Sequence, residues 1–253
     1  MINPLKILAR KTARVTGLEN LIVKIKSGRA KGLKWTLLPY SMYWRGKTEK
    51  VMDQAVESIS KKNFQNIWDL GAHFGFYSLV FRKCFPEAKI YSFEPEPYSF
   101  KKLLFHIKIN GFGDKIKPLN LAVGERDRKS YLDLGRGKGR SVAKISSRRK
   151  VRGDVLISVR KLDELVEKGK INYPDLIKVD VEGFGGKAIK GAKNSITKKR
   201  PVIIVSFHNK KEIEETKEIL RPIGYGILSN GLLSKKWPKK MPSTVVLATE
   251  KYS

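Results

Sequence analysis

The segment IWDLGAHFGFYS (residues 67–78) decides the fold class, together with IYSFEPEP (residues 90–97). The first segment is typical of a buried strand, a glycine-marked turn and the start of a helix. The second is typical of a strand that ends in an acid. Ligands of open α/β sheets bind at the carboxyl ends of such strands. Glu94 follows Gly71 by 94 − 71 = 23 positions, close to the roughly 20-residue offset at which an acid reaches ribose hydroxyls. We therefore expect a site for an adenosine-containing cofactor.

The glycine spacing in the turn distinguishes between cofactors. A dinucleotide site typically has G-x-G-x-x-G, which lets a pyrophosphate rest on the start of a helix, and DLGAHFG (residues 69–75) lacks it. Asp69, at the mouth of the turn, would repel a pyrophosphate but could pair with an ammonium. S-adenosylmethionine carries an ammonium and a sulfonium in place of phosphates, so the pattern favours this cofactor. The alternative is an ordinary βα turn of some other α/β protein.

Composition and charge limit the function classes. The 253 residues can form one domain with a small appendage, and the single Cys84 excludes an internal disulfide and a Cys-rich zinc site. Because no apolar run approaches the roughly 20 residues that span a bilayer, we expect a cytoplasmic protein without a transmembrane segment. The 53 Lys and Arg residues against 24 Asp and Glu give a net charge of +29. This excess indicates a polyanion nearby: nucleic acid, anionic lipid headgroups or an acidic substrate.

The chain divides into an extension and a main domain. Residues 1–48 are predicted to form a basic N-terminal extension, with a short amphipathic helix near residues 5–14 and a β-hairpin over residues 21–37. The helix could lie on an anionic membrane, which would make the protein peripheral to it, or pack on the domain. Strands alternating with helices over residues 49–253 predict a mostly parallel sheet covered on both faces. Within this domain we expect one strand over residues 116–123, one helix over residues 186–198 and an exposed His106.

Eight short motifs follow one another along the chain: GKTE (46–49), DLGAHFGFYS (69–78), FEPEP (93–97), LNLAVG (119–124), LDEL (162–165), IKVDVEGF (177–184), KGA (190–192) and RPVIIVSFH (200–208). In this order they resemble the FkbM family of S-adenosylmethionine-dependent methyltransferases. The resemblance implies a Rossmann-like class I methyltransferase fold, with a mostly parallel seven-stranded sheet and a reversed hairpin at its far edge. It also implies methyl transfer to a hydroxyl oxygen.

Three positions depart from the family pattern. His73 stands where Asn is frequent, and Gly185 and Ser206 replace Glu residues. The loss of two acids speaks against a metal site and suits an anionic substrate.

Three residues are candidates for catalysis. Asp180 ends a central strand at the edge where ligands bind, Glu182 follows it, and His208 ends the next strand. An alcohol nucleophile needs a base, so we assign Asp180 to positioning of cofactor or substrate and His208 or Glu182 to proton removal. Each residue has a plain alternative, because Asp180 or Glu182 could cap the following helix and His208 could hydrogen-bond the sheet edge.

The residues predicted to contact S-adenosylmethionine come from the ends of several strands and from the family pattern. They are Glu49, Asp69, Gly71, Ala72, His73, Gly75, Phe76, Tyr77, Ser78, Glu94, Pro95, Asn120, Ala122, Val123 and Asp180. The candidates for contact with a substrate phosphate or other anion are Arg136, Lys138, Arg140, Arg148 and Arg149, whose alternative role is that of a solvated loop.

We predict methyl transfer to a hydroxyl of a small molecule, a sugar or a lipid-linked glycan. The net charge motivates a second hypothesis, an RNA methyltransferase. The missing Glu residues motivate a third, a non-catalytic protein that binds anionic membranes or nucleic acid.

Overall fold

The computed structural model describes residues 17, 21–37, 41–46, 49–133, 144–146, 154–229, 231–238 and 240–252. The predicted N-terminal helix and the candidate substrate residues Arg136, Lys138, Arg140, Arg148 and Arg149 lie outside these ranges. No helix within the described ranges combines the length and the apolar character needed to cross a bilayer.

Strands and helices alternate along most of the described chain. The helices are α2 (Lys50–Ile59), α3 (Phe76–Cys84), α4 (Pro97–Asn110), α5 (Leu162–Glu167), α6 (Gly185–Gly191), α7 (Lys193–Lys199) and α8 (Lys210–Leu220). The strands are β1 (Ile22–Lys24), β2 (Lys34–Thr36), β3 (Asn66–Leu70), β4 (Lys89–Phe93), β5 (Ile116–Leu119), β6 (Ala122–Val123), β7 (Arg128–Asp133), β8 (Lys144–Ser146), β9 (Val155–Arg160), β10 (Leu176–Val179), β11 (Val202–Ser206), β12 (Gly226–Ser229), β13 (Leu232–Ser234) and β14 (Thr244–Ala248).

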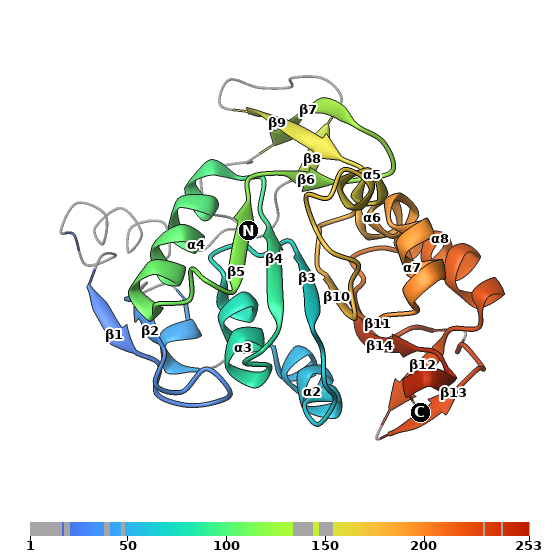
Figure 1. Ribbon diagram of the computed structural model, residues 1–253, viewed down its shortest axis with the longest axis horizontal. Coiled ribbons are helices and arrows are strands. Elements are labelled where there is room, and N and C mark those ends of the chain that lie inside the picture. The colour runs from blue at the N-terminus through green and yellow to red at the C-terminus, as the bar shows by residue number, and fades with distance from the viewer. Residues whose placement is uncertain are drawn as a thin grey trace.

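The main sheet has the order β13-β12-β14-β11-β10-β3-β4-β5 (Figure 1). The five neighbours from β11 to β5 are parallel, whereas β14 is antiparallel to both β11 and β12. The chain runs outward from β3 to β5 and later returns to β10 on the other side of β3, which creates a topological switch point. The mostly parallel sheet is confirmed, but it has eight strands rather than seven because β13 pairs with β12 at the far edge.

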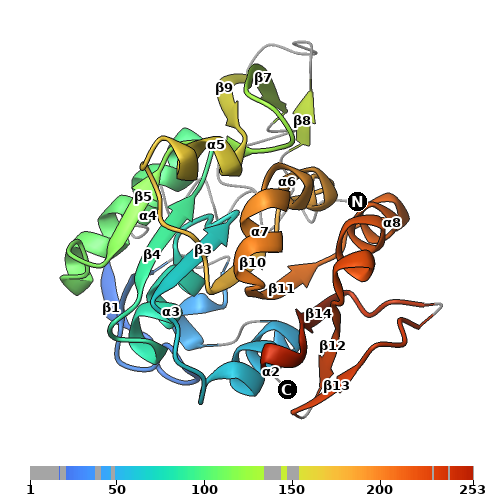
Figure 2. The ribbon, with the colours of Figure 1, turned by 45° about the vertical axis from the view of Figure 1, so that its right-hand side comes forward.

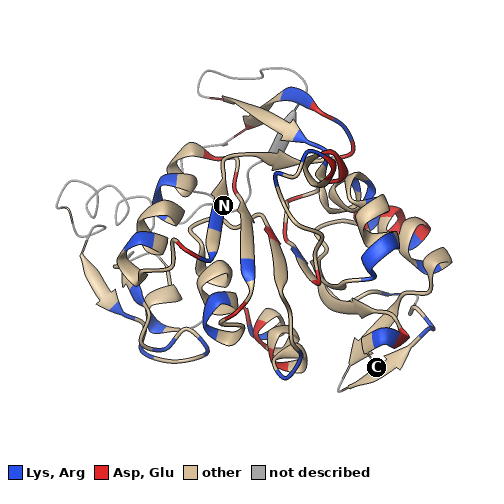
Figure 3. Cartoon of the chain, viewed as in Figure 1, with Lys and Arg blue, Asp and Glu red and all other residues tan. Residues whose placement is uncertain are grey.

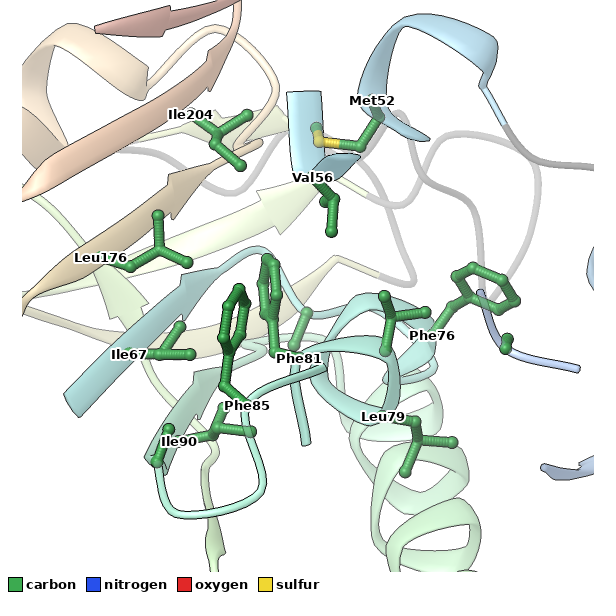
Figure 4. Packing of buried hydrophobic residues seen from close by; sticks show 14 of the residues in the cluster. Met52, Val56, Ile67, Phe76, Leu79, Phe81, Phe85, Ile90, Leu176 and Ile204 are labelled. Atoms are coloured by element: carbon green, nitrogen blue, oxygen red, sulfur yellow. The ribbon is translucent and has the colours of Figure 1, made fainter. Parts of the chain in front are cut away.

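Side-chain alternation along the strands builds a core on each face of the sheet. Ile67 packs in the cluster that includes residues of α2, α3 and α4, whereas the next residue, Trp68, packs with residues of α5, α6, α7 and α8. Figure 2 shows α6 and α7 on the opposite side of the sheet from α3. In Figure 4, Met52 and Val56 of α2 and Phe81 of α3 lie against side chains of the sheet. The predicted covering of both faces is therefore confirmed.

The segment between β5 and α5 adds a second sheet with the order β6-β9-β7-β8. The predicted single strand over residues 116–123 is therefore wrong: β5 belongs to the main sheet, and β6 pairs with β9 instead. Figures 1 and 2 both show this second sheet beyond the carboxyl ends of β4 and β5.

The predicted single helix over residues 186–198 is also wrong, because it divides at Ala192 into α6 and α7. The carboxylate of Asp163 on α5 accepts hydrogen bonds from the backbone N–H groups of Asn194 and Ser195, at 2.9 Å each. These N–H groups belong to the first turn of α7, where a helix has no internal acceptors. A side chain from a distant helix thus fixes the start of α7.

His106 is buried rather than exposed, because the hairpin of β1 and β2 covers its side of α4. Its ring stacks on Trp35 with centroids 3.7 Å apart, Nδ1 lies 2.7 Å from the carbonyl oxygen of Phe74, and Nε2 lies 2.9 Å from Oγ1 of Thr36. Burial lowers the pKa of His106 to about 3. The hairpin shares its core with α2 and α3, and the boundary between an extension (1–48) and a domain (49–253) stays a prediction.

Candidate active site

A cavity of about 360 Å³ opens at the carboxyl ends of β3, β4, β10 and β11. These ends meet because the four strands are parallel neighbours. A hollow of about 50 Å³ adjoins the cavity and shares Tyr43, Glu49, Gly71, His73 and Asp180 with it.

Most of the predicted site residues line one of these two spaces. The cavity is lined by the candidate catalytic residues Asp180, Glu182 and His208 and by Glu49, Gly71, His73, Glu94, Pro95, Ala122 and Val123. Ala72, Phe76 and Tyr77 line the smaller hollow, whereas Asp69, Gly75, Ser78 and Asn120 line neither.

The turn after β3 depends on its two glycines. Gly71 has a φ of +78°, and a Cβ there would lie 2.0 Å from the backbone oxygen of Asp180. Gly75 has a φ of +89°, and its Cβ would lie 2.5 Å from Cδ1 of Leu103. Such φ values strain any residue with a side chain. The missing side chains therefore let the turn approach the end of β10 and helix α4.

Asp69 does not face the cavity, which corrects its predicted pairing with a ligand ammonium. Its fully buried carboxylate accepts hydrogen bonds from Oγ of Ser78, at 2.6 Å, and from Nζ of Lys178, at 3.0 Å. Strand register places Lys178 opposite Asp69, and alternation turns Asp69 towards Ser78 on α3, not out of the strand end. Burial by itself would lower the pKa of Lys178, but Asp69 and Asp180 outweigh this effect and raise it. The ammonium that pairs with Asp69 is thus one of the protein's own.

Glu94 directly follows β4 and lines the cavity, with 6% of its surface exposed. The backbone N–H groups of His73 and Glu96 each donate to one of its oxygens, at 2.8 Å. A carboxylate has about four lone-pair positions, so two remain for a ligand. Burial raises the pKa of Glu94 to about 7, against the opposing effect of the two backbone hydrogen bonds. Asn120 does not line the cavity, but it holds the backbone next to Glu94 in place. Its Nδ2 donates to the backbone oxygens of Glu94 and Pro95, at 2.8 and 3.2 Å.

Acids surround the ring of His208. Nε2 lies 3.5 Å from Oδ1 of Asp180 and 3.6 Å from Oε1 of Glu182, and Nδ1 lies 3.6 Å from Oε2 of Glu212. Asp180 and Glu212 are the main reason that the pKa of His208 is raised to about 10, although partial burial opposes them. His208 is therefore an imidazolium at neutral pH.

The two acids that line the cavity differ in proton affinity. Burial would raise the pKa of Asp180, but Lys178 and His208 outweigh it and the pKa lies below its usual value. For Glu182, burial prevails over the opposing effect of His208 and raises the pKa, and Asp180 and Glu212 add to the increase. Glu182 is thus the stronger base of the two.

Sequence reasoning missed Glu212, whose carboxylate contacts His208 on the side of the ring away from Asp180 and Glu182. Its buried carboxylate accepts hydrogen bonds from the backbone N–H groups of His208, at 2.7 Å, and Gly185, at 2.8 Å. A sequence signal for an inward-pointing Glu212 was present, because Asn209 and Glu212 have the spacing of a capping box at a helix start. The side chain of Asn209 does accept a hydrogen bond from the N–H of Glu212. Sequence analysis offered Asp180 or Glu182 as a possible cap of the following helix. Helix α6 begins without such a side-chain cap, and the N–H of its first residue, Gly185, donates to Glu212 instead.

Sequence reasoning also missed Tyr43 and Phe184 among the residues that line the cavity. Tyr43 lies in a 3-10 helix (Tyr43–Arg45) of the N-terminal segment, and its pKa is raised to about 12, mainly by burial. Phe184 follows Glu182 by two positions and lines the same cavity. Ser206, which stands where the family has Glu, also lines it and lies 3.2 Å from Oγ1 of Thr244. Within the described part of the chain, no group of three or more His, Cys, Asp or Glu residues has the arrangement to hold a metal ion.

Comparison with known proteins identifies the family. The model of the methyltransferase FkbM domain matches residues 69–226, which include the turn after β3, the acid that ends β4 and the Asp180–Glu182–His208 cluster. The chain belongs to the FkbM methyltransferase family.

Two curated methyltransferases are similar to this FkbM-family chain. The hexuronic acid methyltransferase AglP of Haloferax volcanii is 26% identical over 54% of this chain and 54% of its own length. The 2-O-methyltransferase NoeI of Sinorhizobium fredii is 27% identical over 80% of this chain and 86% of its own length. The match thus spans about half of the first relative and most of the second.

A solved structure supports the fold. The crystal structure of methyltransferase FkbM from Methylobacillus flagellatus has a TM-score of 0.50 and 18% identity, over 73% of this chain and 43% of that one. The Rossmann-like fold of class I methyltransferases is confirmed.

The family and the fold imply S-adenosylmethionine as the methyl donor, and the residues present fit this cofactor. The cavity offers a buried carboxylate with free lone pairs at the end of β4, apolar groups of Ala122 and Val123 nearby, and the acids Glu49 and Asp180 at the turn after β3. S-adenosylmethionine has ribose hydroxyls, a flat adenine ring and an ammonium on its aminocarboxyl end, and it needs partners of these three kinds.

Proposed function

We propose that this protein transfers a methyl group from S-adenosylmethionine to a hydroxyl oxygen of a sugar or a similar small molecule. The observation that carries the proposal is the arrangement at one cavity, where the carboxylate of Glu94 lies on one wall and the cluster of Asp180, Glu182 and His208 on another. The first provides for the cofactor, and the second for proton removal from an acceptor.

Within this proposal, Glu94 accepts hydrogen bonds from the ribose hydroxyls, and Ala122 and Val123 contact the adenine. Glu49 and Asp180 face the ammonium of the aminocarboxyl end. The bound cofactor supplies an electrophilic methyl group on a sulfonium. The remaining task of the protein is to hold the acceptor hydroxyl in line with that group, since orientation accounts for much of such a rate increase.

The general base is Glu182. An imidazolium has no lone pair for a proton, and the pKa of His208 is about 10, so His208 cannot act as a base at neutral pH. The carboxylate of Glu182 takes the proton from the acceptor hydroxyl, and its raised pKa improves this step. His208, 3.6 Å away, orients that carboxylate.

The relatives support a sugar hydroxyl as the acceptor. The name of the Haloferax enzyme specifies a hexuronic acid, and that of the Sinorhizobium enzyme specifies 2-O-methylation. The first name thus gives a sugar acid as the acceptor and the second gives oxygen as the accepting atom, and a lipid-linked glycan offers both a sugar and hydroxyl oxygens.

The test combines cofactor binding with turnover in two variants. Calorimetry should show S-adenosylmethionine binding to the wild type, weakened in Glu94→Gln by roughly the 1.5–3 kcal/mol of hydrogen bonds to a charged group. Glu182→Gln should bind the cofactor normally but transfer labelled methyl to a sugar fraction at least about 100-fold more slowly. Glu87→Gln, an exposed carboxylate remote from the cavity, is the control. Absence of binding heat in the wild type would contradict the proposal and favour the non-catalytic alternative.

A second candidate, methyl transfer to RNA, is motivated by the net charge of +29. Figure 3 shows Lys and Arg on α4, α7 and β7, spread over several elements. Labelled methyl that appears on RNA in a cell extract, with RNA affinity that falls steeply with salt, would establish this candidate over the first. Binding to anionic vesicles but not to RNA would support the predicted peripheral membrane contact instead.

A further inference from the structure

Two cations flank an aromatic side chain at the wall of the cavity. Phe184 lines the cavity, and Nζ of Lys187 on α6 lies 4.6 Å from the centroid of its ring. Cζ of Arg128 on β7 lies 6.0 Å from the same centroid. The strand that carries Arg128 also contributes Leu132 to the cavity lining. The second sheet and helix α6 therefore bring two positive charges to one place.

Neither cation forms an ion pair with an acid of the described residues. Nε of Arg128 is buried without a hydrogen-bond partner in this part of the chain. The two acids that precede Arg128 form ion pairs with other residues: Glu125 pairs with Lys190 at 3.0 Å, and Asp127 pairs with Arg160 at 3.2 Å. Lys190, with a smaller effect of Lys187, lowers the pKa of Glu125. A buried donor without an acceptor costs free energy. The arrangement thus has a donor for which the described protein supplies no acceptor.

The positions of these cations and of the acids in the cavity would orient a methyl-accepting substrate. The acids Asp180 and Glu182 lie at the other end of the short segment that leads to Phe184, and they would repel an anion. Arg128 and Lys187 would attract one, and a guanidinium can bind a carboxylate or a phosphate through two parallel hydrogen bonds. A small molecule could therefore place a hydroxyl at Glu182 and an anionic group beside Phe184.

We propose that the acceptor carries an anionic group, a carboxylate or a phosphate, that Arg128 and Lys187 bind beside Phe184. The inference rests on the proposed function for its hydroxyl, and it names the substrate class of the same site. A neutral acceptor would leave Nε of Arg128 without a hydrogen-bond partner, so Arg128, with Lys187 beside it, determines specificity.

The test compares three acceptors that differ at one ring substituent: methyl glucoside, methyl glucuronoside and methyl glucoside 6-phosphate. Their affinities for the full chain are measured by calorimetry, with and without S-adenosylhomocysteine. We expect at least one of the two anionic glycosides to bind about tenfold or more tightly than the neutral one, and the preferred anion identifies the group. Arg128→Gln and Lys187→Gln should each reduce that preference roughly five- to tenfold, and the double variant should lose it.

Lys129→Gln is the matched control, because it removes one positive charge from the same strand but its ammonium bonds to Ser158, at 3.1 Å. The preference should survive in this variant. Equal binding of all three glycosides, binding of none, or a preference that persists in the double variant would overturn the inference. Failure of the proposed function is distinguishable: the anion preference would then be present while no methyl is transferred to any hydroxyl.

Discussion

The buried imidazole of His106 should make the protein sensitive to acid. Burial, with a smaller effect of the Lys102 ammonium, lowers the pKa of His106 from 6.5 to about 3. Between these pH values the unfolded chain binds a proton that the folded chain does not, so the free energy of unfolding falls as the pH falls. The stability is fully present above about pH 6.5 and is lost progressively towards pH 3.

The magnitude follows from the shift of 6.5 − 3 = 3.5 pK units. At about 1.36 kcal/mol per unit, the total loss is about 4–5 kcal/mol below pH 3, of which about 2 kcal/mol is lost by pH 5. A domain with a typical stability of about 5–15 kcal/mol would show this clearly.

The assay is urea unfolding of the wild type and of His106→Gln at pH 8 and pH 5. A glutamine can still donate to the backbone oxygen of Phe74 and accept from Thr36, the two partners of the histidine, but it does not titrate. We expect the wild type to lose about 2 kcal/mol more than the variant between these pH values. Other titrating groups, such as Glu94 and His208, are present in both proteins and cancel in the difference. Equal losses in the two proteins would refute the reasoning.

Three further predictions concern the site. Gly71→Ala should lower the free energy of unfolding by more than about 3 kcal/mol in thermal unfolding, because its Cβ would collide with a backbone oxygen. Gly111→Ala, at a similar φ but with open space around its Cβ, should cost only about 1 kcal/mol. Equal costs of the two variants would contradict this prediction. Lys178→Met should cost about 3–5 kcal/mol, because the buried Asp69 loses its counter-charge and Asp180 keeps only His208; a fully stable variant would show that the pair is dispensable. Glu212→Gln should lower the pKa of His208, as followed by NMR titration, because it removes a carboxylate beside the ring; an unchanged pKa would exclude that influence.

The sequence predicted the elements that local patterns determine. The β-hairpin predicted over residues 21–37 is formed by β1 and β2, because its alternating apolar residues and its turn residues are contained within one segment. The grouping of Asp180, Glu182 and His208 was also predictable, since parallel strands bring their carboxyl ends to one edge. Chain order together with strand direction was sufficient for that part of the site.

The predictions failed where a distant partner decides the outcome. The start of α7 depends on the carboxylate of Asp163, about 30 residues earlier in the chain. The burial of His106 depends on a hairpin that precedes it by 70 residues. The role of Asp69 depends on Lys178, 109 residues away. Local pattern carries no information on such pairs, because each needs the strand order and the register.

The charges of the site form one row of alternating sign that runs from the core to the cavity. Asp69, fully buried, lies 3.0 Å from Lys178, which lies 3.6 Å from Asp180. Asp180 lies 3.5 Å from His208, which lies 3.6 Å from Glu182. Each inner member has an opposite charge on both sides, which stabilises its ionised form. Glu182 has such a partner on one side only, and burial raises its pKa, whereas Lys178 and His208 hold the pKa of Asp180 below its usual value. The motif KVDVE thus places stabilised charges, those of Lys178 and Asp180, towards the core. It places the carboxylate with the raised pKa, that of Glu182, at the end of the row, where an acceptor hydroxyl would lie.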